Sequence, residues 1–390
     1  MTWHKVSRQE GLASRKIFAF CRLSTAEGRV RITPSKPFVR TMIPFLRTKQ
    51  YLSLGFLCFT LKSVAEDESC RSNATHIAWH VQDLPNDGDR TSSVRRSLSA
   101  NTHCEYQNIT EATQEAYTYL RQNVMPFDLP FLETHGFHDD DNSDLPDGLD
   151  DGMIGRTIAY ALRAKQEFNY TDTLPKEIWQ EYVLNYANTN EARSNWRPLL
   201  WKKLRHLVTP EMYNNISAVV RTTNAEMWKL LAPTDSECIV FKSGSTPLIF
   251  DPMSIMTFGY ASCTGTSILL VNALRTLGVP ARMAGTAAWN QNISQGNHNW
   301  VEVYKDGGWY FLEPAPGLSD VDDLERPPHA RWFCNTKSFG PISHNTTLVY
   351  AARLTRGRGV SYPMAWELGN TDVPGEDVSR YYRDVCGDST

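Results

Sequence analysis

Three side chains in the second half of the chain have the types and the order expected of a thiol acyl-transfer site. They are Cys263, His298 and Glu313. A thiol becomes a strong nucleophile when a neighbouring base takes its proton, and the base works best when a third group fixes its orientation. We therefore expect Cys263 to be the nucleophile, His298 the base and Glu313 the carboxylate that orients the base.

The segment after Cys263 predicts a helix that begins at that residue. It reads CTGTSILLVNALRTLGVP, with apolar residues at helical spacing. Ser262 is the expected N-cap, and Gly278 followed by Pro280 ends the pattern. The helix dipole and the free N–H groups of a first turn favour a thiolate and lower a thiol pKa. The alternative is a buried structural or disulfide-bonded cysteine, because cysteine is among the most buried residue types.

His298 and Glu313 fall on two predicted strands of one hairpin. The stretch HNWVEVYKDGGWYFLE alternates in polarity, and Asp306-Gly307 is typical of a two-residue turn. That register places Glu313 opposite Trp300 and diagonally from His298, roughly 7–8 Å away at the backbone and on the same face. Glu302 lies further along the first strand and is the poorer orienting group. Taken singly, His298 could be structural and Glu313 a solvated carboxylate.

These residues together resemble the pattern of the transglutaminase-like superfamily, whose members are relatives of papain-type cysteine proteases. The pattern runs from Cys263 through Arg282–Gly285 and His298–Val303 to Trp309–Pro314. Glu313 stands where the family has Asp, and a longer carboxylate can still orient an imidazole. The strings ASCTGTSILLVNALRTLGVPARMAGT and GNHNWVEV are similar to a microbial branch of the superfamily. With the flanking segments EIWQEYVLNYANTNEARSNWRPLLW and PMAWELGNTDVPGEDVSRYYRD, the resemblance covers roughly residues 110–384.

The resemblance implies an α+β fold. A helical N-terminal region precedes a papain/transglutaminase-like core in which the helix that starts at Cys263 packs on an antiparallel sheet. It implies acyl transfer from protein or peptide amides through a Cys263 thioester, which passes to water or to an amine, with no cofactor and no metal. The Cys263 backbone N–H is one expected oxyanion donor. Trp289 is a candidate wall or second donor, and the alternative, which we favour, is a core tryptophan. The alternative function is a non-catalytic secreted glycoprotein that uses this fold for binding.

The N-terminal part of the chain predicts a secretory signal. Residues 42–65 combine a basic start, a short apolar run and the small-residue pattern Ser63-Val64-Ala65. The apolar run is short against the ~20 residues that span a bilayer, so we expect membrane attachment only if the signal stays uncleaved as an anchor. Residues 1–41 are either a leader or precede the true start. A mainly helical region is then expected over 66–232, and the transglutaminase-like domain with C-terminal strands over 233–390.

Charge divides the chain at the same place. Residues 1–65 hold 12 of the 40 Lys and Arg but 2 of the 43 Asp and Glu, which leaves a formal net charge of −13 on the remainder. A nucleic-acid-binding surface needs basic residues. We therefore expect no nucleic-acid partner, and the length after residue 65 is enough for a large core.

Sequons and cysteines point to the secretory pathway. Six Asn-x-Ser/Thr sequons follow the signal, at Asn73, Asn108, Asn169, Asn215, Asn292 and Asn345. The cysteines after the signal are Cys70, Cys104, Cys238, Cys263, Cys334 and Cys386. If Cys263 is the nucleophile, five remain, which predicts two disulfides and one unpaired thiol. Cys70–Cys104 is one expected pair, and the other pairings stay open.

Helical periodicity dominates the region before Cys263. The predicted helices are Glu111–Val124, Met153–Glu167, Lys176–Tyr186, Pro198–Leu207 and Pro210–Leu231. The acidic stretch 138–151 lacks the residue order of an EF-hand, so we interpret it as a solvated loop rather than a calcium site. His135 and His138 beside it are then surface histidines. After the hairpin, SHNTTLVYAARL is the clearest further strand.

Overall fold

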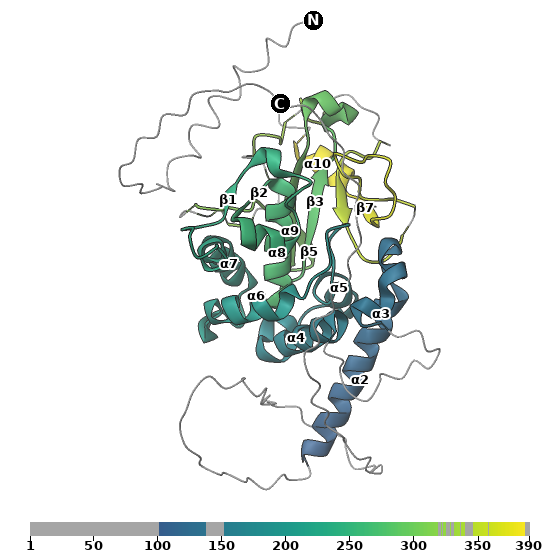
Figure 1. Cartoon of the computed structure of the whole chain (residues 1–390), viewed down its shortest axis with the longest axis vertical. Coiled ribbons are helices and arrows are strands. Elements are labelled where there is room, and N and C mark those ends of the chain that lie inside the picture. Colours follow the sequence, from purple (N-terminus) through teal and green to yellow (C-terminus); the bar gives the residue numbers. More distant parts are fainter. Residues whose placement is uncertain are drawn as a thin grey trace, which may run out of the picture. The chain divides into compact units, whose positions relative to one another are not determined.

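The computed structural model describes residues 101–137 and 152–318, and residues 321–386 with gaps at 322, 325–327, 329–330, 336, 340–345 and 358; side chains are described from residue 111. All of these lie in one compact unit, Ser72–Thr390. The signal segment, the acidic loop 138–151, the sequons at Asn73, Asn108 and Asn345, and the expected Cys70–Cys104 pair lie outside the described side chains. The described residues form an α+β fold, as predicted (Figure 1).

Helices make up the described chain before residue 232. They are α2 (Asn101–Gln122), α3 (Leu132–His135), α4 (Met153–Glu167), α5 (Lys176–Tyr182), α6 (Trp196–Leu204) and α7 (Ile216–Leu230). Short 3-10 turns join them: η1 (Pro126–Phe131), η2 (Asn169–Thr171), η3 (Arg205–Leu207) and η4 (Pro210–Met212). The Met153–Glu167 prediction is confirmed to the residue, because its apolar face packs directly into the core.

The other four predicted helices differ from the structure in their bounds. The helix predicted over Glu111–Val124 is the second half of α2, and the one predicted over Pro198–Leu207 is α6 followed by η3. Two differ more. The helix predicted to reach Tyr186 ends at Tyr182, because the chain then runs buried and irregular and its carbonyl groups accept hydrogen bonds from Arg197 instead of from helical N–H groups. The helix predicted over Pro210–Leu231 is broken, because Asn215 caps α7 by accepting from the Ala218 N–H at 3.1 Å. Its first turn is therefore the separate 3-10 turn η4.

Among the described residues, the main sheet has five strands and contains the predicted hairpin. Its strands are β3 (Ala281–Thr286), β4 (His298–Lys305), β5 (Gly308–Leu312), β6 (Tyr350–Ala352) and β7 (Gly375–Asp377), in the order β5-β4-β3-β6-β7 and antiparallel throughout. A separate parallel pair joins β1 (Val240–Phe241) to β2 (Tyr260–Ala261). The remaining elements are η5 (Ser243–Ser245), α8 (Pro252–Phe258), η6 (Trp289–Gln291), η7 (Ile293–Gln295) and α10 (Ser379–Cys386).

The predicted β4–β5 hairpin and its register are confirmed. Asp306 and Gly307 have φ of 49° and 77°, the positive values that a type I′ turn requires of both central residues. Tyr304 pairs with Trp309 across the ladder. The last pair in that ladder joins Val301 to Leu312, so Glu313 lies directly beyond the end of β5.

Helix α9 (Cys263–Thr276) lies between the sheet and helices α6, α7 and α8 (Figure 1). On one side it contacts β3 and β4, and on the other it contacts α6, α7 and α8. Leu269, Leu274 and Val301 belong to the same fully buried apolar core. The opposite face of the sheet packs Trp300 against Phe333. The helix that begins at Cys263 is thus fixed along its whole length by burial.

A disulfide joins the segment after the hairpin to the C-terminal helix. Cys334 and Cys386 are bonded, and Cys238 is disulfide-bonded as well. Among the cysteines with described side chains, Cys263 is the free thiol. No helix within the described ranges is both long enough and apolar enough to cross a membrane.

Candidate active site

Cys263 is the first residue of α9, as the sequence predicts. Ser262 before it has an extended backbone and occupies the N-cap position, although its hydroxyl makes no capping hydrogen bond. The first N–H groups of a helix have no acceptor within the helix. Cys263, a half-buried residue, therefore lies beside unpaired backbone donors at the positive end of a helix dipole. The same donors are available to an oxyanion.

His298 is the first residue of β4 and pairs with Thr286 of β3. Its side chain is hydrogen-bonded to the Cys263 thiol. The imidazole is enclosed by aromatic rings, with the centroid of Trp332 at 5.4 Å and that of Phe333 at 5.8 Å. These rings hold the imidazole plane and limit its contact with water.

Glu313 completes the arrangement from the segment after β5. Its Oε1 and Oε2 atoms lie 3.1 Å and 3.3 Å from His298 Nε2, so Nδ1 is the ring nitrogen left for the thiol. Asn224 of α7 fixes this segment in two places. Its Nδ2 donates to the Glu313 carbonyl at 2.9 Å, and its Oδ1 accepts from the Ala315 N–H at 3.1 Å. Asn224 is fully buried, and a single Asn within a helical pattern gave no local signal of this role.

The charges of the site favour a thiolate beside an imidazolium. Burial raises the pKa of the Cys263 thiol, but the hydrogen bond and charge of His298 and the Asn299 backbone N–H lower that pKa more, and the net shift is downward. Burial lowers the pKa of His298, whereas the Glu313 charge and hydrogen bonds to Cys263 and Glu313 raise it, to about 10. The two opposite shifts stabilise the charge-separated pair at neutral pH.

Glu302, the poorer candidate for the orienting group, has other partners. Its Oε2 accepts from Arg282 Nε at 2.7 Å, and its Oε1 accepts from the Tyr382 hydroxyl at 2.7 Å. The Arg282 guanidinium also lies over the Trp309 ring, 3.8 Å from its centroid. This buried charge network joins β3, β4 and α10 behind the site rather than within it.

Trp289 packs in the aromatic cluster beside the site. Its ring stacks on Phe333 with centroids 5.5 Å apart and meets Trp332 edge-on at 5.7 Å. Its Nε1 atom is buried without a hydrogen-bond partner. Its contacts are those of a core tryptophan. The loop that follows it carries Asn292, which is exposed, as are Asn169 and Asn215.

No site for a metal emerges from the described residues. Within them, no three His, Cys, Asp or Glu side chains group closely enough to hold an ion. His135, which we expected at the surface beside the acidic loop, lies with Nε2 3.7 Å from the buried carboxylate of Asp128.

The family comparison agrees with the geometry. Residues 220–314 match the family model of the transglutaminase-like superfamily, and this range contains Asn224, Cys263, His298 and Glu313. No curated protein matches the chain significantly.

Several solved structures share parts of the fold at low identity. A proposed cysteine protease from Cytophaga hutchinsonii is 15% identical over 41% of this chain and 51% of its own, with a TM-score of 0.26. Red sea bream transglutaminase is 16% identical over 54% of this chain and 45% of its own, with a TM-score of 0.29. A further transglutaminase is 14% identical over 50% and 47%, with a TM-score of 0.24. The chain thus spans about half the length of each.

Proposed function

We propose that this chain, whose residues 220–314 form a transglutaminase-like domain, is a thiol-dependent acyltransferase or hydrolase that acts on protein or peptide amides. The observation that carries the proposal is the continuous contact from the Cys263 thiol to His298 and on to Glu313, at 3.1 Å for the last pair. Each of the three is placed by a different element, and the pKa shifts of Cys263 and His298 favour the thiolate and the imidazolium that the reaction needs.

The reaction has two halves. The Cys263 thiolate attacks the amide carbonyl carbon, and the negative charge moves to the carbonyl oxygen beside the first N–H groups of α9. His298 Nδ1 then gives its proton to the leaving amine, the C–N bond breaks, and a thioester remains on Cys263. In the second half His298 takes a proton from water or from a primary amine, which attacks the thioester carbonyl. The C–S bond breaks, and the Cys263 thiolate is released beside the imidazolium. Glu313 stabilises the imidazolium in both halves.

The non-catalytic alternative is less well supported by this geometry. A binding protein does not need a free thiol paired with a histidine that a carboxylate orients. Nevertheless the products decide between the two functions, and they also decide between hydrolysis and transfer.

The test is a product screen with a glutamine-containing peptide, with and without a primary amine. Ammonia release alone indicates deamidation, amine incorporation indicates transfer, and peptide cleavage indicates a peptidase. Cys263→Ala is the matched control, because it removes the sulfur and little else. Product formed equally by both proteins, or by neither across a panel of peptide amides, contradicts the proposal.

We also propose that the protein works in the secretory pathway or outside the cell. The Cys334–Cys386 disulfide supports this proposal, because disulfides persist in oxidising compartments. Exposure of the sequons at Asn169, Asn215 and Asn292 supports glycosylation there. Peptide mapping before and after removal of N-linked glycans tests the proposal, and unmodified asparagine at all three contradicts the glycosylation part.

A further inference from the structure

A buried polar chain lies directly beside the nucleophile, and the reaction described above does not use it. Tyr362 donates its hydroxyl proton to Asn299 Oδ1 at 2.6 Å, and Asn299 Nδ2 donates to Thr264 Oγ1 at 2.7 Å. All three side chains are buried. Such a chain of buried hydrogen bonds is costly to break, because each lost partner leaves a desolvated polar group.

Two of the three residues in this series of hydrogen bonds are sequence neighbours of the proposed catalytic residues. Thr264 follows Cys263 on α9, and Asn299 follows His298 on β4. The Thr264–Asn299 hydrogen bond therefore holds the same two elements together one residue beyond the contact between thiol and imidazole. In addition, the backbone N–H of Asn299 hydrogen-bonds the Cys263 sulfur. The Asn299 side chain is thus anchored while its own N–H points at the nucleophile.

Gly285 provides the space that the chain needs. It is the partner of Asn299 in the β3–β4 ladder. A Cβ atom at this position would collide with Asn299 Oδ1, with the His298 carbonyl oxygen and with the Tyr362 hydroxyl. The Tyr362–Asn299 hydrogen bond therefore passes over a strand position where only glycine fits.

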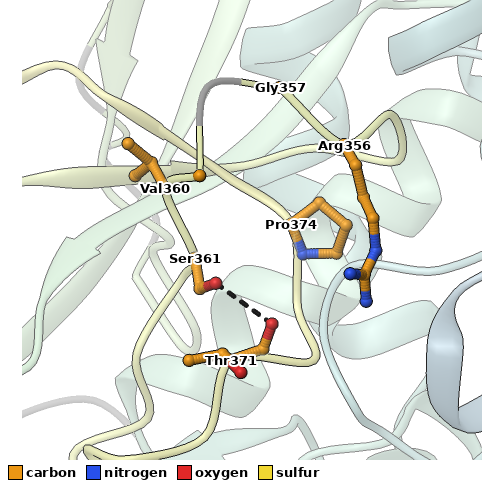
Figure 2. Close-up of a pocket in the computed structure, with 7 residues that line it drawn as sticks. Arg356, Gly357, Val360, Ser361, Thr371 and Pro374 are labelled. Atoms are coloured by element: carbon orange, nitrogen blue, oxygen red, sulfur yellow. Dashed lines mark hydrogen bonds between the residues drawn. The ribbon is translucent and has the colours of Figure 1, made fainter.

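Tyr362 is itself held by a short ladder. Its N–H donates to the Val373 carbonyl at 2.9 Å, and the neighbouring Ser361 pairs with Pro374. Figure 2 shows Ser361 donating from its hydroxyl to the Thr371 carbonyl at 3.0 Å, at the wall of a cavity of about 340 Å³. No side chain of the proposed triad lines this cavity. The ladder fixes Tyr362 independently of α9 and β4.

We propose that Thr264, Asn299 and Tyr362 are positioning residues that hold the Asn299 N–H on the Cys263 sulfur and keep the thiol and His298 in register. The inference rests on the proposed function only in that Cys263 is the nucleophile. Three elements that are distant in sequence meet in this chain. Loss of either hydrogen bond loosens the attachment of the start of β4 to the start of α9 or to Tyr362. The backbone of Asn299 can then shift, and the thiolate loses the N–H donor.

The charged and titratable groups around the thiol come from three elements. They are His298 of β4, Glu313 after β5, and Tyr362 after β6. Burial raises the pKa of Tyr362 well above its usual value, and the nearby Cys263 and Glu302 charges raise it further. Tyr362 therefore stays neutral and keeps donating to Asn299 Oδ1, which directs the Asn299 amide group toward Thr264. The hydrogen bonds from Tyr362 to Asn299 and from Asn299 to Thr264 therefore keep the same direction as long as Tyr362 is neutral.

The test measures the rate at which iodoacetamide alkylates Cys263 as a function of pH, on the full chain with peptide mapping. Tyr362→Phe and Thr264→Val each remove one hydroxyl and keep the shape. Each is expected to raise the midpoint of the profile by about 0.5 to 1 pH unit, which lowers the rate below the midpoint roughly 3- to 10-fold. Thr264→Ser keeps a hydroxyl and should restore the wild-type midpoint.

Matched controls separate positioning from general loss of packing. Thr276→Val removes a hydroxyl that bonds only within α9, to the Asn272 carbonyl at 2.7 Å. Tyr350→Phe removes one that reaches the Thr347 carbonyl. Both should leave the midpoint unchanged even if they lower the melting temperature. If Thr264→Val does not fold, Tyr362→Phe carries the test.

The outcomes distinguish this inference from the proposed function. A depressed midpoint in the wild type that neither variant moves overturns the positioning role and leaves the proposed function standing. An ordinary wild-type midpoint near ~8.5 together with no product from any amide overturns both. Midpoints shifted equally by the controls also overturn the inference, because the effect is then one of stability.

Discussion

Replacement of Glu313 by Gln is the sharpest perturbation of the site, because it removes a charge and keeps the size. The carboxylate lies 3.1 Å from His298 Nε2, with 29% of the Glu313 side chain and 11% of the His298 side chain exposed. Hydrogen bonds to charged groups contribute about 1.5–3 kcal/mol. Since each 1.36 kcal/mol changes a rate tenfold, we expect Glu313→Gln to lower kcat/KM roughly 10- to 100-fold.

The pH dependence of the variant follows from the two pKa shifts. Without the Glu313 charge, the His298 pKa falls from about 10 toward its usual value, so the alkaline limb of the pH–rate profile moves to lower pH. The thiol loses the repulsion from Glu313, which by itself lowers its pKa. It also loses part of the imidazolium charge, which is the larger influence on Cys263. The acid limb therefore moves to higher pH, and the active window narrows from both sides.

The assay is kcat/KM against pH for the wild type, Glu313→Gln and the control Glu302→Gln. The control changes an equally isosteric carboxylate on the same hairpin, bonded to Arg282 and Tyr382. It should lower the melting temperature and leave both limbs in place. If both variants narrow the active pH range equally, or if neither narrows it, Glu313 is not the group that orients His298.

The remaining predictions concern the rest of the chain. Secreted material should begin at or near Glu66 by N-terminal sequencing, and a soluble secreted form that keeps residues 1–65 intact contradicts the signal. Loss of the Cys334–Cys386 disulfide in a double Ser variant should destabilise the fold by about 2–4 kcal/mol in urea unfolding; an unchanged midpoint is the contrary result. Gly285→Ala should cost about 1–3 kcal/mol through overpacking against Asn299, and unaltered stability would show that the strand yields freely.

Local patterns were sufficient to predict the parts of the site that one segment encodes. The helix start at Cys263 follows from apolar spacing that ends at Gly278, and the hairpin follows from an alternating stretch around Asp306-Gly307. The register of this hairpin then predicts that Glu313 lies near His298. These steps need no knowledge of distant residues, because periodicity and turn chemistry are properties of a short stretch.

The features that the sequence did not reveal depend on contacts between distant residues. Asn224 reaches the Glu313 carbonyl from α7, and Tyr362 reaches Asn299 from a segment beyond β6. The early end of α5 has a similar cause, since Arg275 of α9 donates to the Ala187 carbonyl at 2.7 Å and Arg197 to that of Val183 at 2.8 Å. Backbone groups satisfied by side chains of another element leave no periodic trace in the segment itself.

Alkylation of Cys263 as a function of pH shows whether His298 activates this thiol. Iodoacetamide labelling with peptide mapping should show Cys263 reacting with a midpoint well below ~8.5 and faster than any other thiol. His298→Ala should raise that midpoint toward the ordinary value. If Cys263 is found in a disulfide of the folded protein, or if His298→Ala leaves the midpoint unchanged, His298 does not activate the Cys263 thiol.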